Sequence, residues 1–584
     1  MKKAGLIPSM LCVVLCLGAV ASLAWSAEII RGVVFWDKNG NGIQDEGEPG
    51  LHDVSVSNGK EVVLTDGKGL YTLPAYDEMI VFISKPVGFT PPLNKYNIPQ
   101  FFYIHEPNGS PPEIKQFPGI APTGPLPTML NFPLYQEDHP RVFKAIITGD
   151  TQVYSDKEIE YLRDSFVKEV SDPDAALVIA MGDNIGDNLS LYPRYLEVMS
   201  NIGRPIWLVS GNHDINREAN DPAHAFETFK RYFGPTYYSF NYGDVHFVVL
   251  NDVVYPAPQF PSKQYRGEIW GNQMEWLAND LKYVPSEKLI VLNMHIPVVS
   301  DVDRLIPDHN VANRDALYAL LRGRKVVALA GHTHTIDHFQ RGEIQEGWGE
   351  PLPFPEVIVG ATCGSWWSGD LDNNGIPMAY QRDGAPRGYM VWRFEGNEYN
   401  DQFRASGKDP REQMHLSFMT PSFQKWFDSL LDWAQKDPEN RPANPPVTLN
   451  DLPDQRSIRK QDLGTITLMA NVWNSSRDSK VICDFDGKQK FNAKRDPNIG
   501  DPYAQRLQAY VLRYAMGFRM FDTGRFGPST PQPANARHIM QDSFHIWTCS
   551  VPRDLGPGVH DVVVWTIDTH DNSYRQRMVF EVVQ

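Results

Sequence analysis

Short apolar runs that each end in polar residues dominate the middle of the chain. The runs cover residues 142–148, 176–181, 205–210, 289–294 and 325–330, and helical patterns lie between them. Apolar runs of this length are typical of buried strands, and their alternation with helices predicts an α/β sheet. From this pattern we predict a central α/β domain over residues 139–396.

One helix of this domain has a clear start. Ser155 and Glu158 suit a capping box, after which Ile159, Leu162 and Phe166 fall on one helical face. Further helices are predicted over residues 272–284 and 314–321. The pattern therefore predicts helices that cover a sheet on their apolar faces.

The two flanking regions show a different pattern, in which apolar and polar residues alternate between turns. Residues 28–138 are predicted to form an N-terminal β-sandwich domain with a Pro- and Gly-rich connector at 86–125. Residues 397–584 are predicted to form a C-terminal β-sandwich domain, with a helix near 423–433. A chain of 584 residues is too long for one hydrophobic core, which agrees with several domains.

The N-terminus has the pattern of an export signal. Lys2 and Lys3 precede an apolar run at residues 11–23, and Ala24-Trp25-Ser26 suits cleavage. The alternative is a membrane anchor, but the run is short of the ~20 residues that a spanning helix needs. We therefore predict a signal peptide at 1–26, a periplasmic or secreted protein, and no transmembrane segment after cleavage.

Three cysteines remain after the predicted cleavage. Cys483 and Cys549 could pair in an oxidising compartment, and the alternative is three buried thiols including Cys363. The net charge of −16 argues against specific nucleic-acid binding, because that binding depends on Lys and Arg neutralising phosphates. A phosphate substrate would need a local positive centre, which metal ions supply.

The polar residues at the strand ends are of types that bind metal. In an α/β sheet the carboxyl ends of parallel strands carry the ligand site, so these residues should gather at one edge. A single Gly-Asp or a single His after a strand is more often a turn or a structural residue. Their joint occurrence at five successive strand ends favours a site made of Asp150, Gln152, Asp183, Asn212, His213, Asp214, His295, His332 and His334.

These motifs, in this order, resemble the calcineurin-like metallophosphoesterase family. The family pattern runs Asp-x-His, Gly-Asp, Gly-Asn-His-Asp, a lone His and Gly-His-x-His, and only Gln152 departs from it, in place of the first His. The resemblance covers about residues 139–396 and implies a central β-sandwich flanked by helices. The outer regions look like the N- and C-terminal domains of some exported bacterial members.

The resemblance also implies a dinuclear centre. One metal would be held by Asp150, Gln152, Asp183 and His334, and the other by Asp183, Asn212, His295 and His332. A bridging hydroxide would attack a phosphomonoester or phosphodiester. His213 would donate a proton or stabilise the transition state, and Asp214 would orient it.

The metals implied are two divalent ions, Mn, Mg, Fe(II) or Zn. The amide oxygen of Gln152 is a harder ligand than an imidazole, which disfavours Zn at its site. Asn184 stands near the position where purple acid phosphatases carry a Tyr, so that subgroup is rejected. The partner is then a small phosphate-ester substrate, and the sequence favours no particular ester or oligomeric state.

Two other segments carry candidate chemistry. Trp366 and Trp367 follow an apolar run and could stack on a substrate ring, the alternative being ordinary packing. An Asp-x-Asn-x-Asn-Gly…Glu spacing predicts either a calcium loop or a solvated polar turn; its residues are Asp37, Asn39, Asn41, Asp45 and Glu48.

Two competing functions remain at this point. The first is a non-catalytic extracytoplasmic binding or surface protein built on a degenerate phosphoesterase domain. The second is a metal-dependent hydrolase of amides or lactones. The nearly complete motif set favours the phosphoesterase over both.

Overall fold

We describe the protein from a computed structural model. The described residues are 28–170, 174–302, 309–345, 347–434, 436, 440–507 and 543–584. The predicted signal peptide lies outside them. No helix in these ranges has the length and apolar character needed to cross a bilayer.

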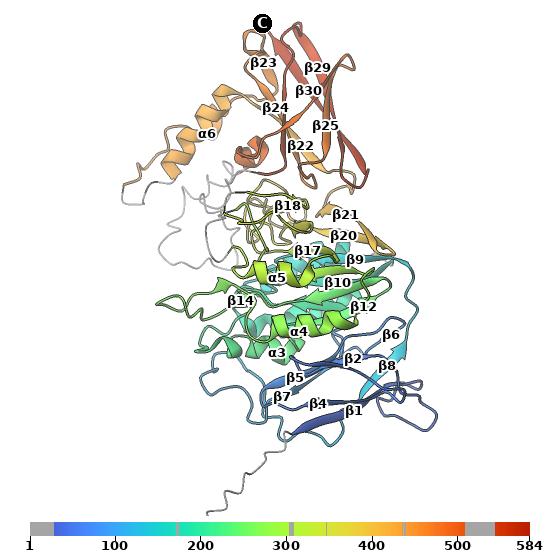
Figure 1. Ribbon diagram of the computed structural model, residues 1–584. Helices are drawn as coiled ribbons and strands as arrows, with labels where there is room; N and C mark the ends of the chain where they lie inside the picture. Colours follow the sequence, from blue (N-terminus) through green and yellow to red (C-terminus); the bar gives the residue numbers. More distant parts are fainter. Residues whose placement is uncertain are drawn as a thin grey trace, which may run out of the picture.

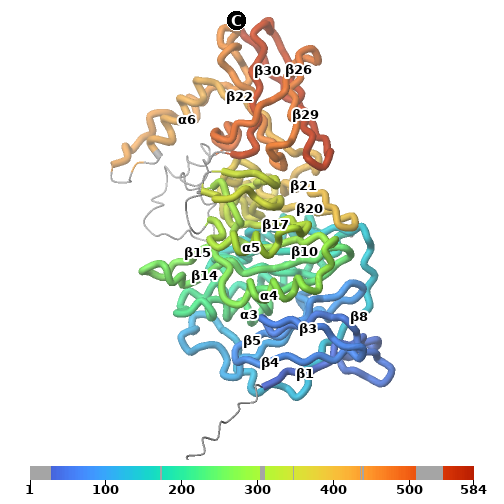
Figure 2. Tube along the Cα trace, viewed as in Figure 1, coloured from blue at the N-terminus to red at the C-terminus, as the bar shows by residue number. Residues whose placement is uncertain are grey.

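Three parts of the chain follow one another along the molecule, with the central domain between the two β domains (Figures 1 and 2). The central domain contains a five-stranded sheet of order β11-β10-β9-β20-β21 and a six-stranded sheet of order β12-β13-β16-β17-β19-β18. The fold is therefore α/β with a central β-sandwich, as predicted. The strands of the two sheets are β9 (Val142–Thr148), β10 (Ala175–Met181), β11 (Ile206–Val209), β12 (Tyr238–Tyr242), β13 (Val245–Val249), β16 (Leu289–Asn293), β17 (Lys325–Ala330), β18 (Ile336–Phe339), β19 (Glu356–Val359), β20 (Gly388–Glu395) and β21 (Glu398–Ala405).

The apolar runs form the interior of this sandwich. Phe143 of β9 packs against Phe247 of β13 and Phe394 of β20, with ring centroids 6.5 and 4.8 Å away. All three rings are buried. Within each sheet, β9, β10 and β11 run parallel, as do β13, β16 and β17. Their carboxyl ends consequently meet at one edge, where the polar residues follow.

Helices cover the sandwich and begin near the predicted positions. Ser155 caps α1 by accepting from the backbone of Glu158, and Ile159 and Leu162 are buried beneath the helix. The reciprocal half of the predicted capping box is absent, because the Glu158 carboxylate accepts from the Tyr154 backbone instead. The helices are α1 (Asp156–Leu162), a π-helical continuation (Arg163–Val167), α2 (Tyr192–Met199), α3 (Glu227–Phe233), α4 (Gln273–Asp280), α5 (Arg314–Leu321) and α6 (Pro421–Ala434), with 3-10 turns at Leu189–Leu191, Ser200–Ile202, Pro222–His224, Leu281–Tyr283, Leu449–Asp451 and Lys460–Asp462.

The N-terminal domain consists of two four-stranded sheets and is joined to the central domain by buried polar contacts. The hydroxyls of Ser84 and Ser239 lie 2.6 Å apart, and their oxygens lie 3.2 and 3.1 Å from Asp280 Oδ1 of α4. A β-bridge also pairs Lys85 with Phe240 of β12. The strands are β1 (Ile29–Trp36), β2 (Ser55–Ser57), β3 (Val62–Leu64), β4 (Leu70–Pro74), β5 (Met79–Ile83), β6 (Phe89–Thr90), β7 (Phe102–His105) and β8 (Phe132–Gln136), and a two-stranded ribbon of the central domain is β14 (Val253–Val254) with β15 (Arg266–Gly267).

The C-terminal domain is also built from two sheets, of order β22-β24-β28-β27 and β23-β30-β29-β25-β26. Cys483 on β25 and Cys549 on β28 form a disulfide between them, so the pairing is realised in the structure, and Cys363 is a free buried thiol. The strands are β22 (Met414–Met419), β23 (Ser457–Arg459), β24 (Thr467–Val472), β25 (Lys480–Phe485), β26 (Gln489–Asn492), β27 (Lys494–Arg495), β28 (Ile546–Ser550), β29 (Gly558–Ile567) and β30 (Ser573–Val583).

Candidate metal centre

The polar residues at the strand ends meet at one edge of the sandwich. Asp150 and Gln152 follow β9, Asp183 follows β10, and Asn212 follows β11 on the first sheet. On the second sheet His295 follows β16, and His332 and His334 follow β17. Apart from half-buried His332, all these residues are at most 3% exposed.

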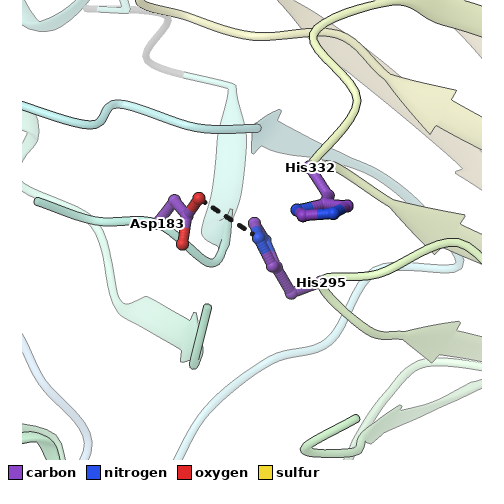
Figure 3. Close-up of side chains that lie close together, drawn as sticks. All are labelled: Asp183, His295 and His332. Carbon is purple, nitrogen blue, oxygen red and sulfur yellow. Dashed lines mark ion pairs between the residues drawn. The ribbon is translucent and has the colours of Figure 1, made fainter. Parts of the chain in front are cut away.

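Three of these side chains form a tight cluster. The ligand-type atoms of Asp183, His295 and His332 all lie within 4.8 Å of one another. Figure 3 shows the Asp183 carboxylate facing the His295 ring, with the His332 ring beside it. The two sheets therefore supply a carboxylate and two imidazoles to one point.

The orientation of His295 is fixed by the backbone. Its Nδ1 lies 2.9 Å from the Met181 carbonyl, which can only accept, so Nδ1 carries the proton. The other nitrogen, Nε2, faces Asn212 Oδ1 at 3.0 Å and Asp183 Oδ2 at 3.3 Å. A backbone carbonyl that holds Nδ1–H in this way is the usual support of a metal-binding imidazole.

His334 repeats this arrangement on the other side of the site. Its Nδ1 donates to the Gly364 carbonyl at 2.5 Å, and its Nε2 lies 3.6 Å from Asp150 Oδ1. The Asp150 carboxylate also accepts from the backbone N–H of His332. The amide nitrogen of Gln152 donates to Tyr154, which leaves its oxygen as the ligand atom.

Five of these residues have a left-handed backbone. The φ angles are +39° at Asp150, +34° at Gln152, +47° at Asp183, +72° at His332 and +56° at His334. Such angles are costly for residues other than glycine, and they gather where function requires a fixed side-chain direction. The site is thus pre-organised by its loops.

The donor atoms fit divalent cations. His332 Nε2 is buried and has no hydrogen-bond partner. Burial lowers the pKa of His295, but attraction to Asp183 and Asp150 outweighs it and raises this pKa to about 10 when no cation is present. A cation between the nitrogen and the carboxylates would replace that proton.

Three family models match consecutive parts of the chain. The model described as calcineurin-like phosphoesterase matches residues 143–335, which contain every predicted metal ligand. The models for the N terminal and the C terminal of calcineurin-like phosphoesterase match residues 38–118 and 356–574. The chain belongs to the calcineurin-like phosphoesterase family. This phosphoesterase is consequently a metal-dependent phosphoester hydrolase, which rejects the non-catalytic alternative.

Several solved structures resemble the phosphoesterase at low sequence identity, and no curated protein matches it. A dimetal phosphatase from Danio rerio is 14% identical, with a TM-score of 0.32, over 45% of this chain and 96% of that one. Purple acid phosphatase PPD1 from yellow lupin (Lupinus luteus) seeds is 11% identical, with a TM-score of 0.31, over 65% and 67%. A structure of PhoD is 13% identical, with a TM-score of 0.32, over 64% and 86%.

The carboxylate beside His213 differs from the predicted one. Asp214 is fully buried, and its oxygens accept from Gly211, Asn184 and Tyr192, so it holds the loop and not the His213 ring. Asp187 lies beside the ring instead, with Oδ1 3.0 Å from His213 Nδ1, although without the alignment of a hydrogen bond.

The adjacent residues Trp366 and Trp367 make different contacts. Trp366 is half-buried and stacks on the metal-site ring of His334, with centroids 4.4 Å apart. Trp367 is 2% exposed and donates its Nε1–H to the Thr151 carbonyl. The predicted substrate role for Trp367 is therefore wrong, because its ring is buried in the protein interior. The predicted substrate role for Trp366 stays a prediction.

Several residues near the site were not singled out from the sequence. The buried Cys363 thiol lies 3.9 Å from Gln152 Oε1 and 3.8 Å from His334 Nδ1. Asp252 is fully buried, which raises its pKa to about 7 despite attraction to His295. Asp187 carried one usable signal, since it lies in the same strand-end loop as Asp183.

The predicted calcium loop forms a hydrogen-bonded turn. The Asp37 carboxylate accepts from the backbones of Gly40 and Gly42, and Asn39 and Asn41 both donate to Asp45. Both Glu48 oxygens accept backbone N–H groups. Among the described residues, the loop carboxylates do not form a close cluster of the kind seen at Asp183. Calcium binding here stays a prediction.

Proposed function

We propose that the protein is an exported phosphoesterase with two divalent cations at the edge of the central sandwich. Asp150, Gln152, Asp183 and His334 would hold one cation, and Asp183, Asn212, His295 and His332 the other. The observation that supports this most is the His295 nitrogen, which faces two oxygens with its proton held on the opposite side.

The reaction proposed is in-line displacement at phosphorus by water, on a phosphomonoester or phosphodiester. Bound cations would lower the pKa of the attacking water and offset the negative charge of the phosphoryl group. The Asp183 carboxylate would serve both cations. Burial raises its pKa, but attraction to His295 and His213 outweighs this and lowers it, so the group is ionised.

His213 is the proposed proton donor to the leaving oxygen. Its side chain is 22% exposed, while its backbone N–H donates to Asp183 Oδ1 at 2.8 Å. Burial lowers the pKa of His213, but Asp183 and Asp187 together raise it above its ordinary value. The raised pKa favours the protonated ring that a proton donor requires.

The test of the reaction uses metal-stripped protein with Mn²⁺, Mg²⁺, Fe²⁺, Zn²⁺ and Ca²⁺ added back singly. Hydrolysis of aryl phosphate mono- and diesters is measured for wild type, Asp183→Ala and Asp432→Ala, the last a matched control on the exposed face of α6. We expect metal-dependent activity that is lost only in Asp183→Ala. Equal activity without metal would contradict the proposal, and the better ester would identify the reaction.

Export is supported by the N-terminal pattern and by the disulfide between Cys483 and Cys549, since such bonds persist in oxidising compartments. The measurement is a thiol count on denatured protein isolated without reductant from the cell envelope or medium. One reactive thiol per chain, from Cys363, is expected together with a mature N-terminus near residue 27. Three reactive thiols in that protein would contradict export to an oxidising compartment.

A further inference from the structure

Two of the three metal-site histidines of the second sheet, His332 and His334, lie on one loop that is held by contacts with other segments. This histidine loop, residues 331–335, connects β17 to β18, and its φ angles at His332 and His334 are left-handed. Left-handed backbone at such residues persists only where surrounding contacts impose it. The contacts that impose it therefore govern the direction of both imidazoles.

Two consecutive residues, Arg382 and Asp383, supply several of these contacts. The backbone N–H of Arg382 donates to the His334 carbonyl at 3.0 Å, and its guanidinium donates to the Thr333 carbonyl at 3.3 Å. Asp383 Oδ2 accepts from the backbone N–H of Ile336 at 2.6 Å. Arg382 and Asp383 thus hold the carbonyls of Thr333 and His334 and the backbone N–H of Ile336, the first residue of β18.

Asp383 is itself held by the C-terminal domain. His545 Nε2 lies 2.9 Å from Asp383 Oδ2, and both side chains are 1% exposed. Asn471 on β24 donates to the Asp383 carbonyl at 3.2 Å and to Asp501 at 2.9 Å. In Figure 1, β18 lies on the side of the central domain that faces β22 and β24.

Both ring nitrogens of His545 have a polar partner. Its Nδ1 lies 2.5 Å from the side-chain oxygen of Asn471. Its Nε2 faces the Asp383 carboxylate. The ring is therefore held between β24 and the residue that contacts the histidine loop.

We infer that Asp383 and His545 are positioning residues of the metal centre. The C-terminal domain holds the histidine loop through them, in the conformation that directs His332 and His334 toward the cations. This inference rests on the proposed metal ligation. Supporting groups of this kind typically change metal affinity about 10- to 100-fold when they are altered.

A second pair in the same interface provides the control. His570, between β29 and β30, lies 3.1 Å from Asp401 of β21, a carboxylate that is 1% exposed. Asp401 also accepts from Asn474 and lies 3.8 Å from His338. His570, Asn474 and His338 all lie outside the histidine loop, so His570→Gln weakens the interface without releasing that loop.

The experiment compares Mn²⁺ affinity of the full chain, stripped of metal, for wild type, His545→Gln, Asp383→Asn and His570→Gln. Calorimetric titration is expected to show a loss of about 10- to 100-fold in His545→Gln and Asp383→Asn, and a change within about twofold in His570→Gln. Saturating Mn²⁺ should restore most of kcat in the first two variants. Circular dichroism of the metal-free proteins checks folding, and Asp383→Asn decides the test if His545→Gln is unfolded.

The outcomes separate this inference from the proposed function. Wild-type protein that binds no Mn²⁺ would overturn the proposed function and this inference with it. Wild-type binding with unchanged affinity in Asp383→Asn would overturn this inference alone. Equal losses in His570→Gln and His545→Gln would also overturn it, because the interface would then act only on general stability.

Discussion

Replacing Asp187 by Asn tests which carboxylate acts on His213. The proposed proton donor must be protonated, so activity is present below the pKa of His213 and is lost as the pH rises through it. Asp187 lies 3.0 Å from the ring and contributes to raising this pKa. In Asp187→Asn we therefore expect the alkaline limb of the pH profile to move to lower pH.

The size of the shift follows from Coulomb's law. Two unit charges 3.0 Å apart interact by about 1.4 kcal/mol in water-like surroundings, the appropriate limit because the Asp187 side chain is 46% exposed. That energy corresponds to about one pKa unit. Arg217 is paired with Asp187 and would lose this partner in the variant. Its positive charge would then lower the pKa of His213 further.

The assay is kcat/KM for phenyl phosphate against pH, followed by release of inorganic phosphate. Phenolate is a poor leaving group, so its departure depends on proton donation more than that of nitrophenolate. Asp214→Asn is the comparison. Its NH2 group would replace one of the two oxygens that accept from Gly211 and Tyr192, so this variant should lose about 1–3 kcal/mol of stability and leave the limb in place. An unmoved limb in Asp187→Asn, or an equal shift in Asp214→Asn, would refute the reasoning.

Three other changes have defined outcomes. Serine at Cys483 and Cys549 opens a loop whose ends are 66 residues apart, which should lower the free energy of unfolding of the C-terminal domain by about 4 kcal/mol in urea titrations; an unchanged midpoint would contradict this. Asp486 lies 2.7 Å from His560 and raises the pKa of His560, although burial alone would lower it. The ion pair between them therefore stabilises the folded protein below about pH 6.5, and this stabilisation is lost as the pH rises through the raised pKa. His560→Gln should remove that part of the pH dependence of Tm, and an unaltered slope would count against it. Gln152→His should raise Zn²⁺ affinity relative to Mn²⁺ in competition titrations, whereas a constant ratio would show that Gln152 is not a ligand.

The arrangement of the fold and the gathering of the strand ends could be predicted from the sequence. Apolar runs such as residues 142–148 are buried strands, and parallel pairing brings Asp150, Asp183 and the later histidines to one edge whatever the loop details. The periodicity of the strands carries this information directly. It needs no knowledge of side-chain direction outside the strands.

Side-chain direction within the loops could not be predicted in the same way. Asp214 follows His213 directly, but its carboxylate turns toward Tyr192, while Asp187 reaches His213 from another loop. Trp366 and Trp367 both have φ of +51°, which no strand or helix period describes. The contact of Asp383 with His545 joins two domains, and no local pattern marks it.

The antiparallel pairing of β9 with β20 has a consequence for synthesis. The second strand of that pair leaves the ribosome long after the first, and it lies beyond Thr335, where the match to the phosphoesterase model stops. Until then one edge of β9 is bare, and a bare apolar strand edge invites pairing with other chains. A nascent chain of this protein is accordingly vulnerable to aggregation until β20 has emerged, and a fragment ending at Thr335 would keep that vulnerability permanently.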